Sequence, residues 1–233
     1  MMKKITAFDD KSLLISSAFA FALGTLNGAL TERGSAVLLG AGGSTPGPLY
    51  KALSSANIDW SKVTIGLTDE RWVPADHDAS NEALMRRTLL KNEAATATLL
   101  PMVTDASQSA FAESQRVNAL YASAANACDL MILGMGPDAH TLSWFPEAKG
   151  LGDALAPDTS QMVTAIEAKQ SAVTGEHTVR MTLTLPAVAC AKHVLLLITG
   201  HEKRTVLETA TPDTPIQHMI QTAGDRLSIY WAP

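Results

Sequence analysis

The sequence predicts an α/β protein with a doubly wound, mostly parallel sheet and helices on both faces. Short, continuously apolar runs recur along the chain, as expected for strands buried on both faces of a parallel sheet. Helix-like stretches separate these runs, and this alternation is typical of the doubly wound class. A chain of 233 residues, 46% of them hydrophobic, can bury the core of one such domain. We therefore expect residues 1–233 to form a single domain.

Four apolar runs are expected to be buried strands of this sheet: residues 36–39, 63–67, 130–133 and 194–198. Two further runs, residues 181–184 and 227–231, are expected to add strands at its edges. Helices are expected between the strands, over residues 49–56, 82–90 and 106–127. Residues 150–174 mix Gly, Pro, Asp and Ser around one apolar patch and give the least regular pattern.

The N-terminal region carries two conflicting signals. Lys3 and Lys4 precede an apolar stretch over residues 13–23, which resembles a secretory signal sequence. However, Asp9 and Asp10 stand between the lysines and the apolar stretch, which is unusual in such signals. The two acids suit the first turn of an amphipathic helix instead. We therefore expect a mature N-terminal helix that covers the sheet, a cytoplasmic location and no membrane-spanning segment.

The charge balance restricts the partners. The formal net charge is −5 and Lys and Arg are not clustered, so a nucleic-acid partner is not expected. A small anionic ligand is compatible with the sequence if a few cations and backbone amides surround it. The cysteines, Cys128 and Cys190, lack the spacing of metal ligands and are expected to be buried thiols.

The clearest chemical signal lies between Gly134 and Thr141. This segment follows the expected strand at residues 130–133 and places Asp138 and His140 in a turn rich in Gly and Pro. A lone histidine is usually structural, but ligands of open α/β sheets bind at the carboxyl ends of the strands. A carboxylate two residues from an imidazole at such an edge favours a functional site.

A glycine-rich segment, residues 42–46, follows the first expected strand. Thr45 is expected to cap the next helix and Pro46 to be its first residue. Free N–H groups and two hydroxyls at this helix start would form a phosphate cradle. The segment matches neither a Walker loop nor a dinucleotide fingerprint. The alternative is an ordinary strand-to-helix turn.

Charged residues follow the other strands. Asp69, Glu70 and Arg71 come after the second strand, where they are costly unless exposed or paired. Arg71 is suited to bind a carboxylate or phosphate through two hydrogen bonds, and the alternative is a solvated charge run. Arg180 opens an otherwise apolar run and is expected to point either into the cleft or into solvent. Lys203 falls in the first turn of a helix, where a cation is unfavourable unless an anion is close.

These motifs are expected to converge, because parallel strands bring their carboxyl ends to one edge. The resulting site would combine the Asp–His pair with phosphate-binding groups. The sequence shows neither a nucleophilic Ser elbow nor a Cys with its own base. It therefore predicts acid–base chemistry on a phosphorylated small molecule.

The same motifs resemble one known family. In order and approximate spacing, they match the 6-phosphogluconolactonases, which share a family with the glucosamine-6-phosphate deaminases. The matching segments are residues 42–46, 69–73, 80–81, 134–141, 143–146, 180–186 and 200–203. The resemblance is loose over residues 212–233. It implies a Rossmann-like domain and a carboxylic ester hydrolase that needs no metal or other cofactor. The implied reaction converts 6-phospho-D-glucono-1,5-lactone to 6-phosphogluconate in the pentose phosphate pathway.

The resemblance, together with the chemistry, implies roles for individual residues. His140 is expected to be the general base, and Asp138 to orient it or to stabilise its cation. Arg71 is expected to stabilise the oxyanion or to hold the sugar. The remaining residues expected to bind substrate or its phosphate are Gly42, Gly43, Ser44, Thr45, Asp69, Arg180 and Lys203.

The chain departs from the family pattern at a few positions. Ala139 stands where the family usually has Gly, and a positive φ there would strain the turn. Leu142 and Trp144 replace residues that are usually small, and they are expected to narrow the pocket.

Two other functions fit the same fold. The nearest is an amino-sugar-phosphate deaminase or aldose–ketose isomerase, but the deaminase pattern has Glu where this chain has Phe145. The other is a non-catalytic sugar-phosphate-binding module of a transcription regulator. About 35 residues precede the first expected strand, too few for a DNA-binding motif and a covering helix. The sequence does not indicate an oligomeric state.

Overall fold

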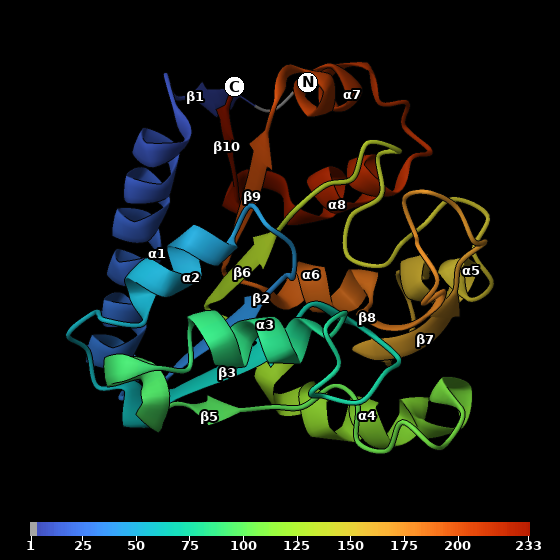
Figure 1. Ribbon diagram of the computed structural model, residues 1–233, viewed down its shortest axis with the longest axis horizontal. Helices are drawn as coiled ribbons and strands as arrows, with labels where there is room; N and C mark the ends of the chain where they lie inside the picture. Colours follow the sequence, from blue (N-terminus) through green and yellow to red (C-terminus); the bar gives the residue numbers. More distant parts are fainter. Residues whose placement is uncertain (1–3) are drawn as a thin grey trace.

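The computed structural model describes residues 4–233, and two sheets organise it (Figure 1). Within these residues the larger sheet has seven strands in the order β1-β10-β9-β6-β2-β3-β5, all paired in parallel. Its strands are β1 (Ile5–Ala7), β2 (Ala36–Gly40), β3 (Val63–Leu67), β5 (Thr98–Leu99), β6 (Leu130–Leu133), β9 (His193–Thr199) and β10 (Leu227–Ala232). The four strands expected from continuous apolar runs are confirmed as β2, β3, β6 and β9.

Helices cover both faces of the larger sheet, as the predicted class requires (Figure 1). One face carries α1 (Lys11–Arg33), with α2 (Gly47–Leu53) and α3 (Asn81–Thr88) beside it. The other side carries α4 (Ala110–Asn126), α6 (Leu185–Cys190) and α8 (Pro215–Ala223). Two further helices, α5 (Leu151–Leu155) and α7 (His201–Thr209), contact β7 (Val163–Glu167) and β9 respectively.

The long helix α1 is the expected N-terminal helix. The Asp10 side chain caps it by accepting a hydrogen bond from the Leu13 N–H, at 2.8 Å. One face is buried, and α1 contacts strands β2, β6, β9 and β10. By length and composition alone, α1 could cross a membrane, which was not expected from the sequence. The difference arises because the helix continues to Arg33, well past the apolar stretch at residues 13–23. Lys3 lies outside the described residues.

A second, smaller sheet was not predicted. Within residues 4–233 it contains three antiparallel strands in the order β4-β8-β7, with β4 at Asp69–Arg71 and β8 at Val179–Leu183. The runs at 181–184 and 227–231 are additional strands, as expected, but neither lies at a sheet edge. The run at 181–184 belongs to the central strand β8, and β10 lies between β9 and β1, a three-residue strand that carries no clear pattern. β7 lies inside the stretch that gave the least regular pattern.

The two cysteines differ in burial. Cys128 is buried, as expected, and burial raises the pKa of its thiol. Cys190 is only partly buried, because it is the last residue of α6. Both thiols are free.

Candidate active site

A cleft of about 420 Å³ lies where the carboxyl ends of β2, β6 and β9 meet the small sheet. The structure brings nearly all the residues predicted from the sequence to its walls. Those that line it are Gly42, Gly43, Ser44, Thr45, Asp69, Arg71, His140, Arg180 and Lys203. Asp138 lies next to the cleft and contacts it through His140. Among residues 4–233, no group of three or more His, Cys, Asp or Glu side chains is arranged to hold a metal ion.

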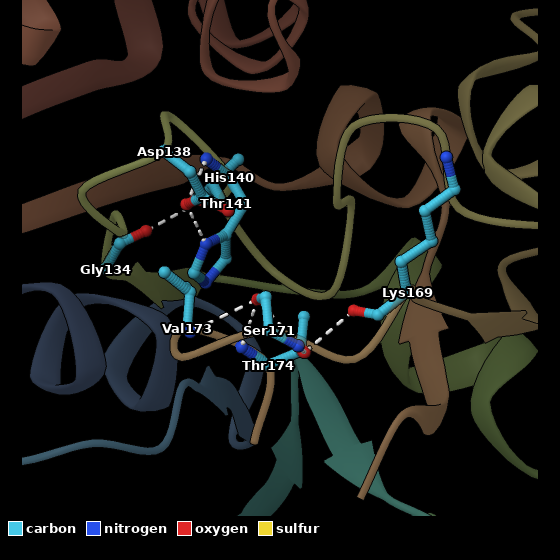
Figure 2. A network of polar contacts seen from close by, with 8 residues as sticks. All are labelled: Gly134, Asp138, His140, Thr141, Lys169, Ser171, Val173 and Thr174. Carbon is cyan, nitrogen blue, oxygen red and sulfur yellow. Dashed lines mark hydrogen bonds and ion pairs between the residues drawn. The ribbon is translucent and has the colours of Figure 1, made fainter. Parts of the chain in front are cut away.

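His140 and Asp138 form a close pair (Figure 2). Nδ1 of His140 contacts Oδ1 of Asp138, and the backbone N–H of His140 donates to the same oxygen at 3.3 Å. Burial alone would raise the pKa of Asp138, but the hydrogen bond and charge of His140 lower it below its usual value. Asp138 is therefore ionised near neutral pH. Since Asp138 holds Nδ1, Nε2 is the nitrogen through which His140 can exchange a proton with a ligand.

The turn that carries this pair is strained at Ala139. Its φ of 64° lies in the left-handed region, where a Cβ costs roughly 1–2 kcal/mol. Hydrogen bonds hold the turn in this shape: Gly136 N–H donates to the His140 carbonyl at 2.9 Å, and Ile216 N–H donates to the Ala139 carbonyl at 3.1 Å. The Ala139 side chain is also buried. The turn therefore tolerates the Cβ because its surroundings fix the conformation.

The glycine-rich segment after β2 forms a second wall. Gly43 has a φ of 99°, which favours glycine, and a Cβ on Gly42 would overlap the side-chain amide of Asn81. The predicted helix start is wrong, since α2 begins at Gly47 and Pro46 is its cap residue. Pro48, and not Pro46, lies in the first turn of α2. Ser44 and Thr45 line the cleft as turn residues.

Asp69 and Glu70 of β4 are buried, Arg71 is partly buried, and all three are hydrogen-bonded, which excludes the solvated charge run. Asp69 accepts a hydrogen bond from the Ser143 hydroxyl at 2.6 Å. Glu70 accepts hydrogen bonds from one hydroxyl and three backbone N–H groups. The donors to Glu70 are the Ser80 hydroxyl and the N–H groups of Arg71, Asn81 and Glu82. Burial raises the pKa of Glu70, and these hydrogen bonds offset only part of that effect.

Glu70→Gln is expected to lower the free energy of unfolding by about 1–3 kcal/mol, because an amide NH₂ would then face N–H donors. Denaturant unfolding followed by circular dichroism measures this loss. Glu32→Gln is the control, since the Glu32 side chain is 75% exposed and its ion pair contributes little. Equal stability of the two variants would contradict the structural role of Glu70.

Arg71 and Arg180 lie opposite each other on the paired strands β4 and β8. Arg71 Nη1 donates to the Ala79 carbonyl at 3.0 Å and to the Asn81 side-chain oxygen at 2.8 Å. The Asn81 amide in turn donates to the Asp69 carbonyl at 2.8 Å, so Asn81 ties the Arg71 side chain to the backbone of β4. Sequence reasoning missed this role of Asn81, although residues 80–81 belong to the family pattern.

Arg180 is buried, although it lies near the start of β8. Its Nε donates to the His177 carbonyl at 2.6 Å, and its Nη2 to the Thr174 carbonyl at 2.7 Å. Burial and the nearby charge of Arg71 lower the pKa of Arg180 to about 10. Part of its hydrogen-bonding capacity thus holds a loop, and the rest can face a ligand.

This loop carries a tight turn from Ser171 to Thr174 (Figure 2). The Thr174 hydroxyl donates to the Lys169 carbonyl at 2.8 Å, and the Val173 N–H donates to the Ser171 hydroxyl at 3.2 Å. Within this turn, Ala172 and Val173 line the cleft. No sequence pattern marked this wall, since it lies in the irregular stretch and the loop that follows it.

Lys203 lies in the first turn of α7, as expected, and is partly buried. Burial lowers the pKa of its ammonium, while Glu202 and Asp138 partly offset that effect. Three cations, Arg71, Arg180 and Lys203, thus share the cleft. Their mutual repulsion favours a ligand with more than one negative charge, such as a phosphate.

The two bulky departures from the family pattern behave differently. Leu142 lines the cleft, as expected. Trp144 does not narrow it, because its ring is fully buried and its Nε1–H donates to the Leu183 carbonyl at 2.8 Å.

The fold and the cleft together are those of an enzyme that acts on a small anionic molecule. Residues 9–229 match the model of the glucosamine-6-phosphate isomerases/6-phosphogluconolactonase family. The match includes most of the C-terminal segment, where the motifs were only loosely similar. The chain belongs to this family.

Several relatives are similar to the chain over nearly its whole length. A 6-phosphogluconolactonase of Rhizobium meliloti is 37% identical over 100% of both chains, and one of Caulobacter vibrioides is 34% identical over 98% and 97%. A solved 6-phosphogluconolactonase of Shewanella baltica superposes with a TM-score of 0.90 at 32% identity, covering 100% of both chains. A monomeric glucosamine-6-phosphate deaminase, 18% identical with a TM-score of 0.71, shares the fold.

Proposed function

We propose that this protein hydrolyses 6-phospho-D-glucono-1,5-lactone to 6-phosphogluconate, with His140 as the general base. The observation that carries the proposal is one cleft that holds an imidazole–carboxylate pair beside three cations. The relatives named 6-phosphogluconolactonase span the whole chain, which supports this substrate over an amino sugar phosphate. The chain also has Phe145, and not a carboxylate, at the position where the deaminase pattern has Glu.

The proposed reaction begins when Nε2 of His140 takes a proton from water as the water oxygen bonds to the lactone carbonyl carbon. Asp138 stabilises the imidazolium that forms. The tetrahedral intermediate then expels the ring oxygen, which receives the proton from His140 and becomes a hydroxyl. The carbonyl is restored as a carboxylic acid, which ionises. A δ-lactone hydrolyses readily in water, so a modest acceleration from acid–base catalysis is sufficient.

The phosphate and the developing oxyanion require the cations. Lys203 and Arg180 are proposed to hold the phosphate, with the hydroxyls of Ser44 and Thr45 close by. Arg71 is proposed to stabilise the oxyanion or to hold the sugar, because Asn81 fixes its guanidinium at the cleft wall. Gly42 and Gly43 are proposed to let the backbone approach the substrate. Asp69 is proposed to contact a sugar hydroxyl.

The direct test is the formation of 6-phosphogluconate from freshly prepared lactone, measured above the spontaneous rate. Glucosamine 6-phosphate is assayed in parallel. Lactone turnover without deamination is the expected result. Deamination alone would support an amino-sugar-phosphate deaminase. Binding of 6-phosphogluconate without turnover would support a non-catalytic sugar-phosphate-binding module.

Lys203→Ala is expected to raise KM by roughly ten-fold with little change in kcat, because a phosphate contact acts equally in the ground and transition states. Steady-state kinetics of lactone hydrolysis measure both constants. Lys51→Ala, on the exposed side of α2, is the control. A fall in kcat at unchanged KM would place Lys203 at the reacting carbonyl instead.

We further propose that the enzyme works in the cytoplasm as one domain, with neither nucleic acid nor membrane as a partner. The acidic net charge and the packing of α1 on the parallel sheet support this.

A further inference from the structure

The ring of Phe145 links the proposed base to one of the cations. Its centroid lies 4.3 Å from that of the His140 ring, with 36° between the planes. The guanidinium carbon of Arg180 lies 5.4 Å from the same Phe145 centroid. Phe145 is only 4% exposed and does not line the cleft, so it cannot contact substrate directly.

The surroundings of Phe145 hold its ring in place. It packs with a small apolar cluster that includes Ala148, Ile166 and Ala168, separate from the main core. Ile166 and Arg180 are paired residues on β7 and β8, so the ring rests on the small sheet. Phe145 therefore connects an imidazole on a loop of the large sheet to a rigid element of the other sheet.

His140 needs such a support. Asp138 holds one nitrogen, but a single hydrogen bond leaves the ring plane free to tilt. The tilted Phe145 ring packed against the imidazole restricts that freedom, and catalysis requires that a group be held within about 10–20° of its productive orientation. The face of an aromatic ring also attracts cations, and His140 becomes a cation in the proposed reaction.

We propose that Phe145 is a positioning residue, which fixes the plane of the His140 imidazole and stabilises it when protonated. This inference rests on the proposed lactonase function. The contribution of Phe145 is greatest when His140 carries the proton, so its loss lowers kcat rather than raising KM.

The test compares Phe145→Leu, which removes the aromatic face, with Phe145→Tyr, which keeps it. Phe145→Leu is expected to lower kcat about ten-fold with KM changed less than about three-fold, as the loss of a cation–aromatic contact implies. Phe145→Tyr is expected to retain most of the activity. Phe21→Leu is the matched control, because Phe21 contacts His193 edge-on at 5.9 Å, outside the cleft.

Proton NMR adds a readout that does not depend on turnover. The ring current of Phe145 shifts the carbon-bound imidazole protons of His140, which are assigned by their absence in His140→Asn. These resonances are expected to move in Phe145→Leu and to stay near their wild-type positions in Phe145→Tyr. Phe145→Met serves in place of Phe145→Leu if the latter does not fold.

Unchanged kcat in Phe145→Leu, a rise in KM alone, or unmoved His140 resonances would overturn the inference. Absence of lactonase activity in the wild-type protein would overturn the proposed function instead. The two failures are distinguishable, because the NMR shift reports the contact of the Phe145 ring with His140 whatever the substrate is.

Discussion

His140→Ala is expected to reduce the enzymatic rate of lactone hydrolysis by about 10²–10⁴-fold, the range typical of general acid–base catalysis. The imidazole side chain is 19% exposed at the cleft wall, so its removal should leave the fold intact. The measurement is 6-phosphogluconate formation, corrected for the spontaneous rate, with circular dichroism and thermal unfolding as checks of folding.

His193→Ala is the matched control. His193 begins β9 at the opposite end of that strand from the cleft and packs against Phe21. It should retain wild-type activity. Near-wild-type turnover in His140→Ala would rule out His140 as the base. The cations of the cleft would then have to activate the attacking water without this imidazole.

Gly136→Ala is expected to cost on the order of 10²-fold in kcat, because small displacements of a catalytic group have effects of this size. A Cβ at this position would overlap Nδ1 and Cε1 of His140 and lie 2.7 Å from Oδ1 of Asp138. These atoms are the ends of side chains, which can move aside. The protein should therefore fold with the His140–Asp138 pair displaced, and steady-state kinetics should show the loss.

Gly134→Ala provides the comparison within the same segment. A Cβ on Gly134 would meet nothing within 4 Å, so His140 should keep its place and most of the activity should remain. If both alanine variants lose the same activity, displacement of the imidazole is not the cause of the loss, because both glycines line the cleft but only Gly136 contacts His140.

Sequence patterns were sufficient for the parts of the fold that have a local signature. A continuous apolar run marks a buried parallel strand wherever it occurs, which is why β6 and β9 were predicted within a residue or two. The polar residues that follow such strands were assigned to the cleft for the same reason. Topology places the carboxyl ends of parallel strands at one edge.

The small sheet could not be predicted this way. β4 consists of three charged residues, whose burial depends on partners far along the chain, such as Ser143 for Asp69. The two hydrogen bonds from Arg180 to its loop and the ring of Phe145 against His140 are also properties of the folded state. No local periodicity encodes them.

The division of the cleft between two sheets has a consequence for the whole molecule. His140 and Lys203 follow strands of the large sheet, whereas Arg71 and Arg180 belong to the small one. A substrate that contacts all four residues would link the two sheets. Part of the binding free energy would then be used to hold the two sheets in a fixed relative position. Because such a ligand binds only the folded protein, it would raise the free energy of unfolding by RT ln(1 + L/Kd), where L is the free ligand concentration.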